Sequence, residues 1–223
     1  MSLKKYSFWS IFCYGIVFVS PVVLNYLGVV HTAEDIIFAT TIAYTLGAVV
    51  LLALYAKQKE PLAIEKAVKK ASFIKIIFYG VIGIFIAILL QNLAVYLETL
   101  LFGASAPSQN TQDIVKMILA NPAFIVATSF AGPIMEELVF RRSILGLIAR
   151  YSNFWIGALI SSILFALAHN DGHLLIYFFI GFFFALLYKS TGRIWTSMIT
   201  HVGMNSLVIF VQLAVHYGWV PGV

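Results

Sequence analysis

Long uninterrupted apolar runs dominate the hydrophobic pattern of this chain. Three of them lie in the first half, at about residues 8–30, 36–56 and 73–102. None shows the alternation of apolar and polar positions that a strand of a membrane barrel would need. About 20 apolar residues are enough for a helix to cross the hydrocarbon core. Each run therefore predicts a membrane-spanning helix.

The second half of the chain continues this pattern but carries more polar residues. A long helical segment at 121–150 includes Pro122 and Pro133, and apolar segments follow at 154–169, 173–188 and 194–217. The pattern predicts an all-α polytopic membrane protein, a bundle of about seven to eight transmembrane helices with a buried polar active-site cavity. We see no internal repeat and no soluble domain, so residues 1–223 are expected to form a single integral membrane domain.

Charged segments between the apolar runs predict the orientation. Lys and Arg residues gather at the N-terminus and at 57–75, 141–150 and 189–193, whereas the 31–35 loop is acidic and the 103–113 loop is polar. Because positively charged loops remain on the cytoplasmic side, the N-terminus is expected to be cytoplasmic. The 57–75 segment is amphipathic, so we expect it to lie on the membrane surface.

Composition supports lipid as the main solvent of this chain. Hydrophobic residues make up 61% of the sequence and charged residues only 10%, against about 45–50% and about 25% in soluble domains. The net charge of +5 comes from residues near helix ends, where they anchor helices and contact anionic lipid. Since no basic patch is interleaved with stacking aromatics, nucleic acid is not an expected partner.

Four charged residues interrupt the apolar surroundings of the 121–149 segment: Glu136, Glu137, Arg141 and Arg142. Three central charges would cost about 8–10 kcal/mol on insertion, and the apolar residues of the segment return only about 4–7 kcal/mol. The helix must therefore face a protein interior or a wet cavity, where charged residues are functional candidates.

Spacing separates the two glutamates. Glu137 and Arg141 are four residues apart with the acid first, which favours an ion pair within one helix. Glu136 lies about 100° around the helix from Glu137 and is left without that arginine. It is therefore a candidate general base or acid. The alternative is that both glutamates only pair with arginines and lock helices together.

Two histidines and an asparagine add to this chemistry. His169 ends one apolar run, His201 lies inside another, and Asn205 follows one turn later on the same helix face. A single buried histidine is more often a hydrogen-bonding link between helices. Together with Glu136, however, these side chains supply a base, an imidazole partner and two donors, which are the groups needed for attack of water on an amide carbonyl.

These residues resemble the CPBP family, the CAAX-protease and bacteriocin-processing proteins also called the Abi family. The three matching motifs are Glu136-Glu137-x-x-x-Arg141, Phe165-x-x-x-His169 and His201-x-x-x-Asn205, and the resemblance covers residues 121–207 as a catalytic core. It implies an intramembrane endopeptidase related to the prenyl-protein enzymes. By this resemblance, Glu136 would activate water, and His169 would assist it. His201 and Asn205 would hold the oxyanion. Glu137 and Arg141 would have a supporting, structural role. Arg142 departs from the glycine expected after the motif arginine.

The resemblance does not decide whether a metal ion is bound or which peptide is the substrate. No metal ligand is certain, but Glu136, His169 and His201 could equally hold zinc. His173 could be a fourth ligand, although its neighbours Asp171 and Gly172 favour a turn. The expected partners are membrane lipid and a peptide or protein substrate that is prenylated, bacteriocin-like or otherwise membrane-associated.

Other functions fit the sequence less well. The HExxH zinc helix and the Gly-x-Ser-x-Gly elbow are absent, and Ser161 and Ser162 are better explained as helix-packing residues. A transporter would show broken helices in matching halves, which we do not find. The main alternative is a non-catalytic bacteriocin self-immunity or membrane scaffold protein of the same family.

Overall fold

The structure, a computed structural model, describes residues 1–103 and 109–220, and within these ranges it contains helices and no strands. The prediction of an all-α polytopic membrane protein is confirmed. The predicted polar loop at 103–113 lies partly outside the described residues, since 104–108 are not included.

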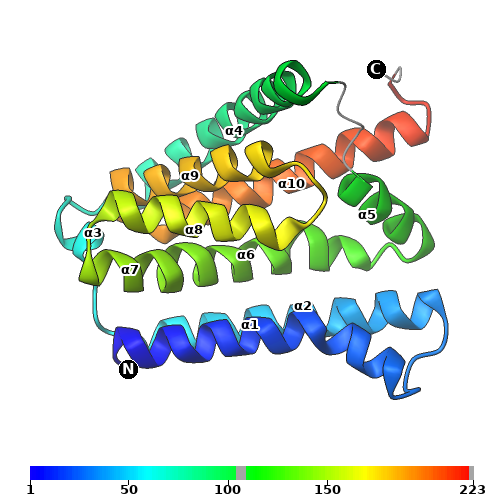
Figure 1. The fold of residues 1–223 in the computed structure, drawn as a ribbon, viewed down its shortest axis with the longest axis horizontal. Coiled ribbons are helices and arrows are strands. Elements are labelled where there is room, and N and C mark those ends of the chain that lie inside the picture. Colours follow the sequence, from blue (N-terminus) through cyan, green and yellow to red (C-terminus); the bar gives the residue numbers. More distant parts are fainter. Residues whose placement is uncertain (104–108, 221–223) are drawn as a thin grey trace.

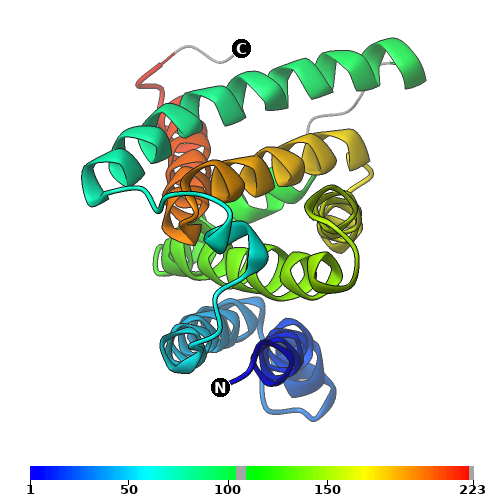
Figure 2. The same cartoon turned by 90° about the vertical axis from the view of Figure 1, so that its left-hand side faces the viewer.

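An N-terminal hairpin forms one layer of the bundle. Its helices are α1 (Leu3–Tyr26) and α2 (Ala33–Lys57). Thr32 and Asp35 form a capping box that begins α2 after the acidic loop, as their side chains bond each other's backbone N–H groups. Figure 2 shows this hairpin at the base of the molecule, separated from α4 by the central helices.

A long composite helix packs directly on this hairpin. It runs through η1 (Val126–Ala131), α6 (Gly132–Glu136), η2 (Glu137–Leu145) and α7 (Gly146–Tyr151), and η1 and η2 have π-helical hydrogen bonding. The remaining helices cover its other side (Figure 1). They are α3 (Ala63–Lys66), α4 (Phe73–Phe102), α5 (Gln109–Ala120), α8 (Phe154–His169), α9 (Leu174–Thr191) and α10 (Ile194–His216).

Fewer helices than expected can cross a membrane on length and composition alone. Five helices of the described ranges meet these criteria, namely α1, α2, α4, α9 and α10. The 16-residue α8 is shorter, and the composite helix carries the motif charges. The composite helix is buried in the bundle, whereas α8 lies at its side and exposes an apolar face with Trp155 and Leu159. The lower end of the predicted range, seven, is reached only by counting both.

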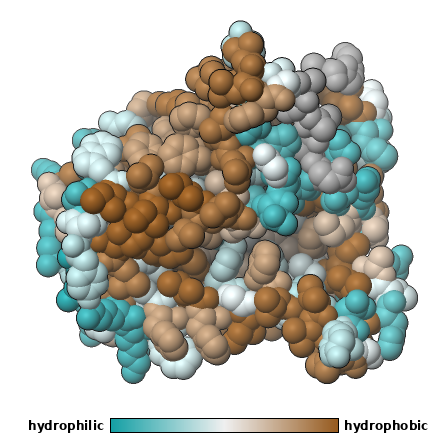
Figure 3. Space-filling model, viewed as in Figure 1, coloured by the Kyte–Doolittle hydropathy of each residue, from teal (hydrophilic) through white to brown (hydrophobic). Residues whose placement is uncertain are grey.

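Apolar side chains cover the outside of the bundle. Large hydrophobic residues such as Phe78, Phe85 and Leu89 on α4 are more than half exposed. Figure 3 shows hydrophobic side chains across the middle of one face and hydrophilic ones toward its left and right ends. This distribution suits a protein surrounded by lipid.

The basic segment at 57–75 differs from its prediction as an amphipathic surface helix. Between the end of α2 at Lys57 and the start of α4 at Phe73, only Ala63–Lys66 is helical, a single turn. The physical reason is that two acids of the segment contact the composite helix: Glu65 turns inward and pairs with the buried Arg142 at 2.7 Å, and Glu60 pairs with Arg150 at the surface at 2.9 Å. These two pairs hold the segment against η2 and α7.

The segments rich in Lys and Arg gather at one end of the bundle. The Met1 amino group donates to the Lys57 carbonyl, and the Ala71 N–H donates to the Thr191 carbonyl. With the Glu60–Arg150 pair, these contacts join the N-terminus, the 57–75 segment, the end of α7 and the α9–α10 turn. The acidic loop before α2 lies at the opposite end (Figure 1).

Candidate active site

A proline sets the course of the helix that carries the two glutamates. Pro133 has no N–H to donate, and its ring would clash with the carbonyl four residues earlier in a regular α-helix. The preceding turn η1 is widened accordingly, and the Gly132 N–H bonds Ala127 O five residues back. Widened turns of this kind often occur at functional sites. The second one, η2, starts at Glu137 itself.

Glu137 and Arg141 form the buried pair that the sequence predicts. The Glu137 Oε1 to Arg141 Nε distance is 3.6 Å, and both side chains are essentially inaccessible. The same carboxylate oxygen lies 3.1 Å from His201 Nδ1. Because a carboxylate only accepts hydrogen bonds, Nδ1 is assigned the proton, and Nε2 is the imidazole atom that faces the cavity.

The Arg141 guanidinium is held by aromatic rings. Its central carbon lies 4.2 Å from the Phe165 ring centroid, 5.4 Å from that of Phe184 and 5.9 Å from that of Phe140. None of its nitrogens has a hydrogen-bond partner in the ranges the structure covers. Cation–π contacts and the Glu137 charge thus stabilise this cation in the apolar interior.

Glu136 approaches the other side of the same imidazole. Its Oε2 lies 3.5 Å from His201 Nε2, and its side chain keeps 18% of its surface exposed, against 0% for Glu137. With Nδ1 already bound to Glu137, a proton on either Nε2 or the Glu136 carboxyl avoids two facing lone pairs. Glu136 and His201 Nε2 thus face each other at the border of a cavity.

His169 and Asn205 line the cavity from two other helices. His169 Nδ1 lies 2.8 Å from the Phe165 carbonyl, which only accepts, so Nε2 keeps its lone pair. Its ring stacks on Tyr177 with centroids 3.7 Å apart, and Asn170 ends α8 directly after it in the left-handed conformation. The Asn205 amide donates to Thr128 O over a long 3.4 Å, and its second N–H remains available for a ligand.

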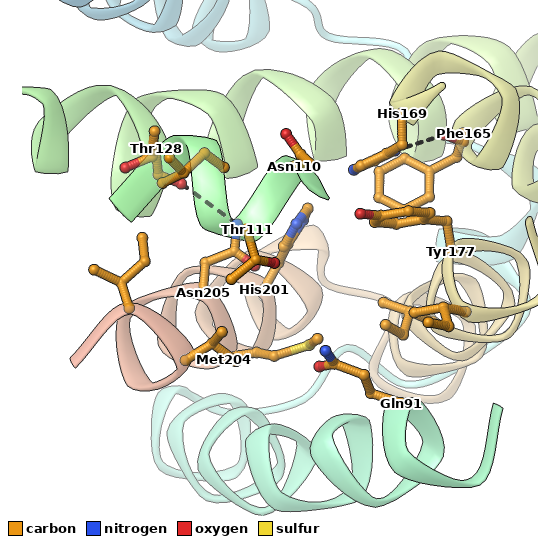
Figure 4. Close-up of a pocket in the computed structure, with 15 residues that line it drawn as sticks. Gln91, Asn110, Thr111, Thr128, Phe165, His169, Tyr177, His201, Met204 and Asn205 are labelled. Atoms are coloured by element: carbon orange, nitrogen blue, oxygen red, sulfur yellow. Dashed lines mark hydrogen bonds between the residues drawn. The ribbon is translucent and has the colours of Figure 1, made fainter. Parts of the chain in front are cut away.

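Two cavities meet at these residues. A cavity of about 490 Å³ contains Glu136, His169 and Asn205 on its wall. A smaller one of about 100 Å³ contains His169, His201 and Asn205, and Figure 4 shows the last three residues around this smaller space. The larger volume lies within the range of ligand pockets, about 300–1,000 Å³. The four sequence-predicted residues are thus brought to one site.

The proposed metal ligands do not converge in this arrangement. Within residues 1–103 and 109–220, no three His, Cys, Asp or Glu side chains are placed to share a metal ion. Glu136 and His201 contact each other directly, whereas His173 lies outside the two cavities and bonds Glu98 on α4 at 2.8 Å. We therefore derive no step of the reaction through zinc.

Sequence analysis missed several residues on the cavity walls. Tyr14 and Tyr44 reach the larger cavity from the N-terminal hairpin, and Gln91 reaches the smaller one from α4. Each lies in a mostly apolar helix whose few polar residues do not repeat along one face, so the sequence does not show which way the side chain points. Their position inside membrane spans was the available signal.

Arg142, the departure from the family pattern, lies away from the reacting groups. It donates to Tyr188 Oη at 2.8 Å, pairs with Glu65 at 2.7 Å and bonds Gln58. Burial alone would raise the pKa of the Glu65 carboxyl, but Arg142 and the Tyr188 hydroxyl lower it below its usual value. Arg142 therefore ties the 57–66 segment to η2.

Comparisons with known proteins show what this chain is similar to. Residues 118–207 match a family described as type II CAAX prenyl endopeptidase Rce1-like. The chain is 41% identical over 166 residues to YdiL of Bacillus subtilis, to which a membrane-peptidase role is attributed, covering 74% of this chain and 67% of YdiL. It is 30% identical over 197 residues to the membrane-embedded CAAX protease MroQ of Staphylococcus aureus, covering 85% of this chain and 79% of MroQ. No solved structure matches the chain significantly.

Proposed function

The chain belongs to the CPBP family of CAAX-type membrane peptidases, and from this premise we propose that it is an intramembrane endopeptidase in which Glu136 activates a water molecule for attack on a peptide bond. The observation that carries the proposal is the Glu136–His201 contact at 3.5 Å, on the border of a cavity also lined by His169 and Asn205.

The reaction begins with proton transfer from water to Glu136. The carboxylate takes the proton while the water oxygen forms a bond to the scissile carbonyl carbon. The electron pair of the carbonyl moves onto its oxygen. Collapse of this tetrahedral intermediate breaks the C–N bond, and protonated Glu136 gives its proton to the leaving amine. No other acid or base is needed to balance the step.

The imidazoles and the amide position the reacting atoms. The Nε2 lone pair of His169 accepts a hydrogen bond from the attacking water and orients its oxygen. The free N–H of Asn205 and the Nε2–H of His201 donate to the developing oxyanion. Glu137 keeps the His201 ring in the required orientation through Nδ1, and Arg141 balances the Glu137 charge.

The substrate is a peptide segment at or in the membrane. A cavity of about 490 Å³ inside a lipid-covered bundle suits an extended peptide that arrives with a lipid group or a neighbouring apolar segment. The CAAX name of MroQ and of the matched family favours a peptide with a prenylated cysteine. An unlipidated membrane-anchored peptide is the competing substrate in the test.

Two quenched-fluorescence peptides in proteoliposomes test the proposal, one with a farnesylated cysteine and one with serine in its place behind an apolar anchor. We expect the purified protein to cleave one of them and a Glu136→Gln variant to be at least 10²-fold slower. Metal content is measured on the same sample before and after a chelator. Turnover by Glu136→Gln at the wild-type rate would refute the proposal.

An assay of the Glu136→Gln variant in cells distinguishes a catalytic role from a binding role. The wild type is assayed for protection of the cells against a peptide or for processing of a peptide in them. If the Glu136→Gln variant does this as well as the wild type, hydrolysis is not the function, and the result favours the immunity or scaffold alternative. Because Glu136 keeps 18% of its surface exposed and has one long contact to His201, the amide is expected to leave the fold intact. Circular dichroism and Tm in detergent check this.

A further inference from the structure

The N-terminal hairpin contributes two tyrosines to the wall of the larger cavity. Tyr14 on α1 and Tyr44 on α2 line this space together with Glu136. Both side chains are partly exposed. Neither hydroxyl is hydrogen-bonded within the described ranges, and neither belongs to the polar atoms that are sealed from solvent without a partner. The two O–H groups are therefore accessible to a ligand in the cavity.

The other two hydroxyls on this wall are already used by the fold. Thr40 donates to the Ile36 carbonyl at 2.7 Å, and Thr128 donates to the Phe124 carbonyl at 3.1 Å. Each of these bonds lies within one helix, where a short threonine side chain reaches the carbonyl four residues earlier. A tyrosine hydroxyl stands at the end of a rigid ring and cannot reach its own backbone in this way. The two tyrosines are thus the hydroxyl donors that this wall offers to a ligand.

Packing against the composite helix places one tyrosine on each side of Glu136. A Cβ added at Gly132 would lie 3.7 Å from the Tyr44 ring. The Tyr14 ring packs edge-on against Phe140, with centroids 5.9 Å apart. These two contact points lie four residues before and four residues after Glu136, about one helical turn in each direction. Both hydroxyls are close enough to Glu136 to interact electrostatically with its carboxylate, so the tyrosines flank the proposed base.

An extended peptide has acceptors that match this arrangement. Its successive carbonyls point toward opposite edges of the chain. If the scissile carbonyl points toward His201 and Asn205 on α10, the carbonyls before and after it point the other way, about 7 Å apart. Figure 2 shows the hairpin and α10 on opposite sides of the composite helix. Since a lipid-covered cavity offers these carbonyls little water, they need donors from the protein.

We propose that the Tyr14 and Tyr44 hydroxyls are substrate-binding groups, which donate hydrogen bonds to the main-chain carbonyls on either side of the scissile bond. The inference rests on the proposed peptidase function and deepens it. The negative charge of Glu136 favours the orientation in which the hydroxyl hydrogens point into the cavity, so the pair presents donors to the peptide. The hairpin thereby holds the main chain with the scissile carbonyl turned toward α10. Both tyrosines lie outside the segment that matches the family, 118–207.

Removal of each hydroxyl with its ring kept tests the proposal. In Tyr14→Phe and Tyr44→Phe we expect KM to rise about three- to tenfold and kcat to stay near wild type, because a bond made in both the bound substrate and the transition state changes only binding. Tm should not change, since neither hydroxyl has a partner within the described fold. Tyr79→Phe on α4 is the matched control, because this side chain is 45% exposed and lines neither cavity. Wild-type KM in both hairpin variants would overturn the proposal.

Thioamide peptides identify the carbonyls that are bound. In the peptide that the wild type cleaves, the oxygen of each main-chain carbonyl except the scissile one is replaced in turn by sulfur, a weaker acceptor. A thioamide next to the scissile bond should raise the wild-type KM about threefold. The same thioamide should have no further effect on one of the two hairpin variants. Equal effects of every thioamide on all three proteins would contradict the inference.

A different use of the same hydroxyls is a hydrogen bond to Glu136 itself. Loss of a donor to a carboxylate disfavours its charged form. The acid limb of the kcat profile would then move to higher pH in Tyr14→Phe or Tyr44→Phe, while substrate binding stayed the same. We expect instead that the acid limb is kept and that the Kd of the cleavable peptide for Glu136→Gln rises when either hydroxyl is also removed. A moved acid limb with an unchanged Kd would refute the role in substrate binding.

These measurements also separate the inference from the proposed function. If the wild type cleaves neither probe, the proposed function fails and the role of the two tyrosines falls with it. If the wild type cleaves a probe and Glu136→Gln does not, while Tyr14→Phe and Tyr44→Phe equal the wild type, only the role of the tyrosines is lost.

Discussion

Two adjacent glutamates contact opposite nitrogens of one imidazole in this protein, and they differ in burial and in charge balance. Glu137 is fully buried between His201 and Arg141, with its charge balanced. Glu136 is partly exposed to the cavity. Because neighbouring helix residues point about 100° apart, one ring can touch both. The buried acid orients the imidazole, and the exposed one remains free to accept a proton.

Asn205→Ala tests the oxyanion role at the residue scale. We expect kcat to fall about 10²–10³-fold, the typical cost of one oxyanion donor, with a smaller loss than in Glu136→Gln measured on the same peptide. Removal of the long bond to Thr128 O, at 3.4 Å, should change Tm little. A loss as large as that of Glu136→Gln would give Asn205 another role.

The site residues that could be predicted from the sequence are those with an unusual charge or a characteristic spacing. Glu136, His169, His201 and Asn205 are polar groups deep in apolar segments, and the structure brings them together as expected; their catalytic roles stay predictions. Gln91 and Tyr44 were missed as site residues because a polar side chain in a mostly apolar helix faces lipid, protein or cavity according to how the neighbouring helices pack. That rotation depends on the whole bundle.

At the scale of elements, the crossing of α8 and α9 holds Arg141 in place. A Cβ added at Gly181 would lie 3.0 Å from Phe165 Cδ1 and 3.2 Å from Arg141 Nη2. These helices therefore approach closely at the point where the aromatic rings surround the guanidinium. The absence of a side chain at residue 181 makes room for a buried cation.

Gly181→Ala is expected to disturb this crossing. Overpacking of a tight core contact costs about 1–3 kcal/mol, so Tm should fall, and kcat should fall as well because Arg141 supports Glu137 and His201. Gly15→Ala on α1 is the matched control, since an added Cβ there meets nothing within 4 Å. It should be neutral or stabilising by up to about 1 kcal/mol. Equal Tm values for the two variants would contradict the packing argument.

The link between the 57–66 segment and η2 carries a pH dependence. The pKa of Glu65 is lowered by Arg142 and Tyr188 against the effect of burial, so its stabilisation is present above the usual value of 4.5 and is lost as the pH falls through the lower folded value. Glu65→Gln leaves Arg142 without its charged partner and should reduce the unfolding free energy by about 3 kcal/mol at pH 7. The variant should also show a flatter Tm profile between pH 7 and pH 4.

Glu60→Gln is the control for this link. Glu60 pairs with Arg150 at the surface, where the two side chains are 39% and 41% exposed, and such pairs contribute little. A loss of Tm as large as that of Glu65→Gln would show that the segment, and not the buried pair, sets the stability. The sequence did not predict this link, because Glu60 and Glu65 contact arginines more than 75 residues away.

At the scale of the whole molecule, the two ends of the bundle differ in charge and in access to the site. The N-terminus, the 57–75 segment and the α9–α10 turn share one end. The larger cavity extends toward the other end, because its wall includes Ile36 and Thr40 from the start of α2 and Asn170 from the end of α8. The larger cavity thus lies nearer the end that carries the acidic loop than the basic end.

Orientation in the membrane therefore decides from which side a peptide reaches Glu136. We propose that the basic end is cytoplasmic, in accordance with the Lys and Arg bias, and the larger cavity then opens toward the outer side. In a Cys13→Ser background, which removes the one native cysteine, His31→Cys should react with a membrane-impermeant maleimide in intact bacterial cells. Lys69→Cys should react only after permeabilisation. The reverse labelling would place the opening on the cytoplasmic side, and a peptide made inside the cell would then reach Glu136 without crossing the membrane.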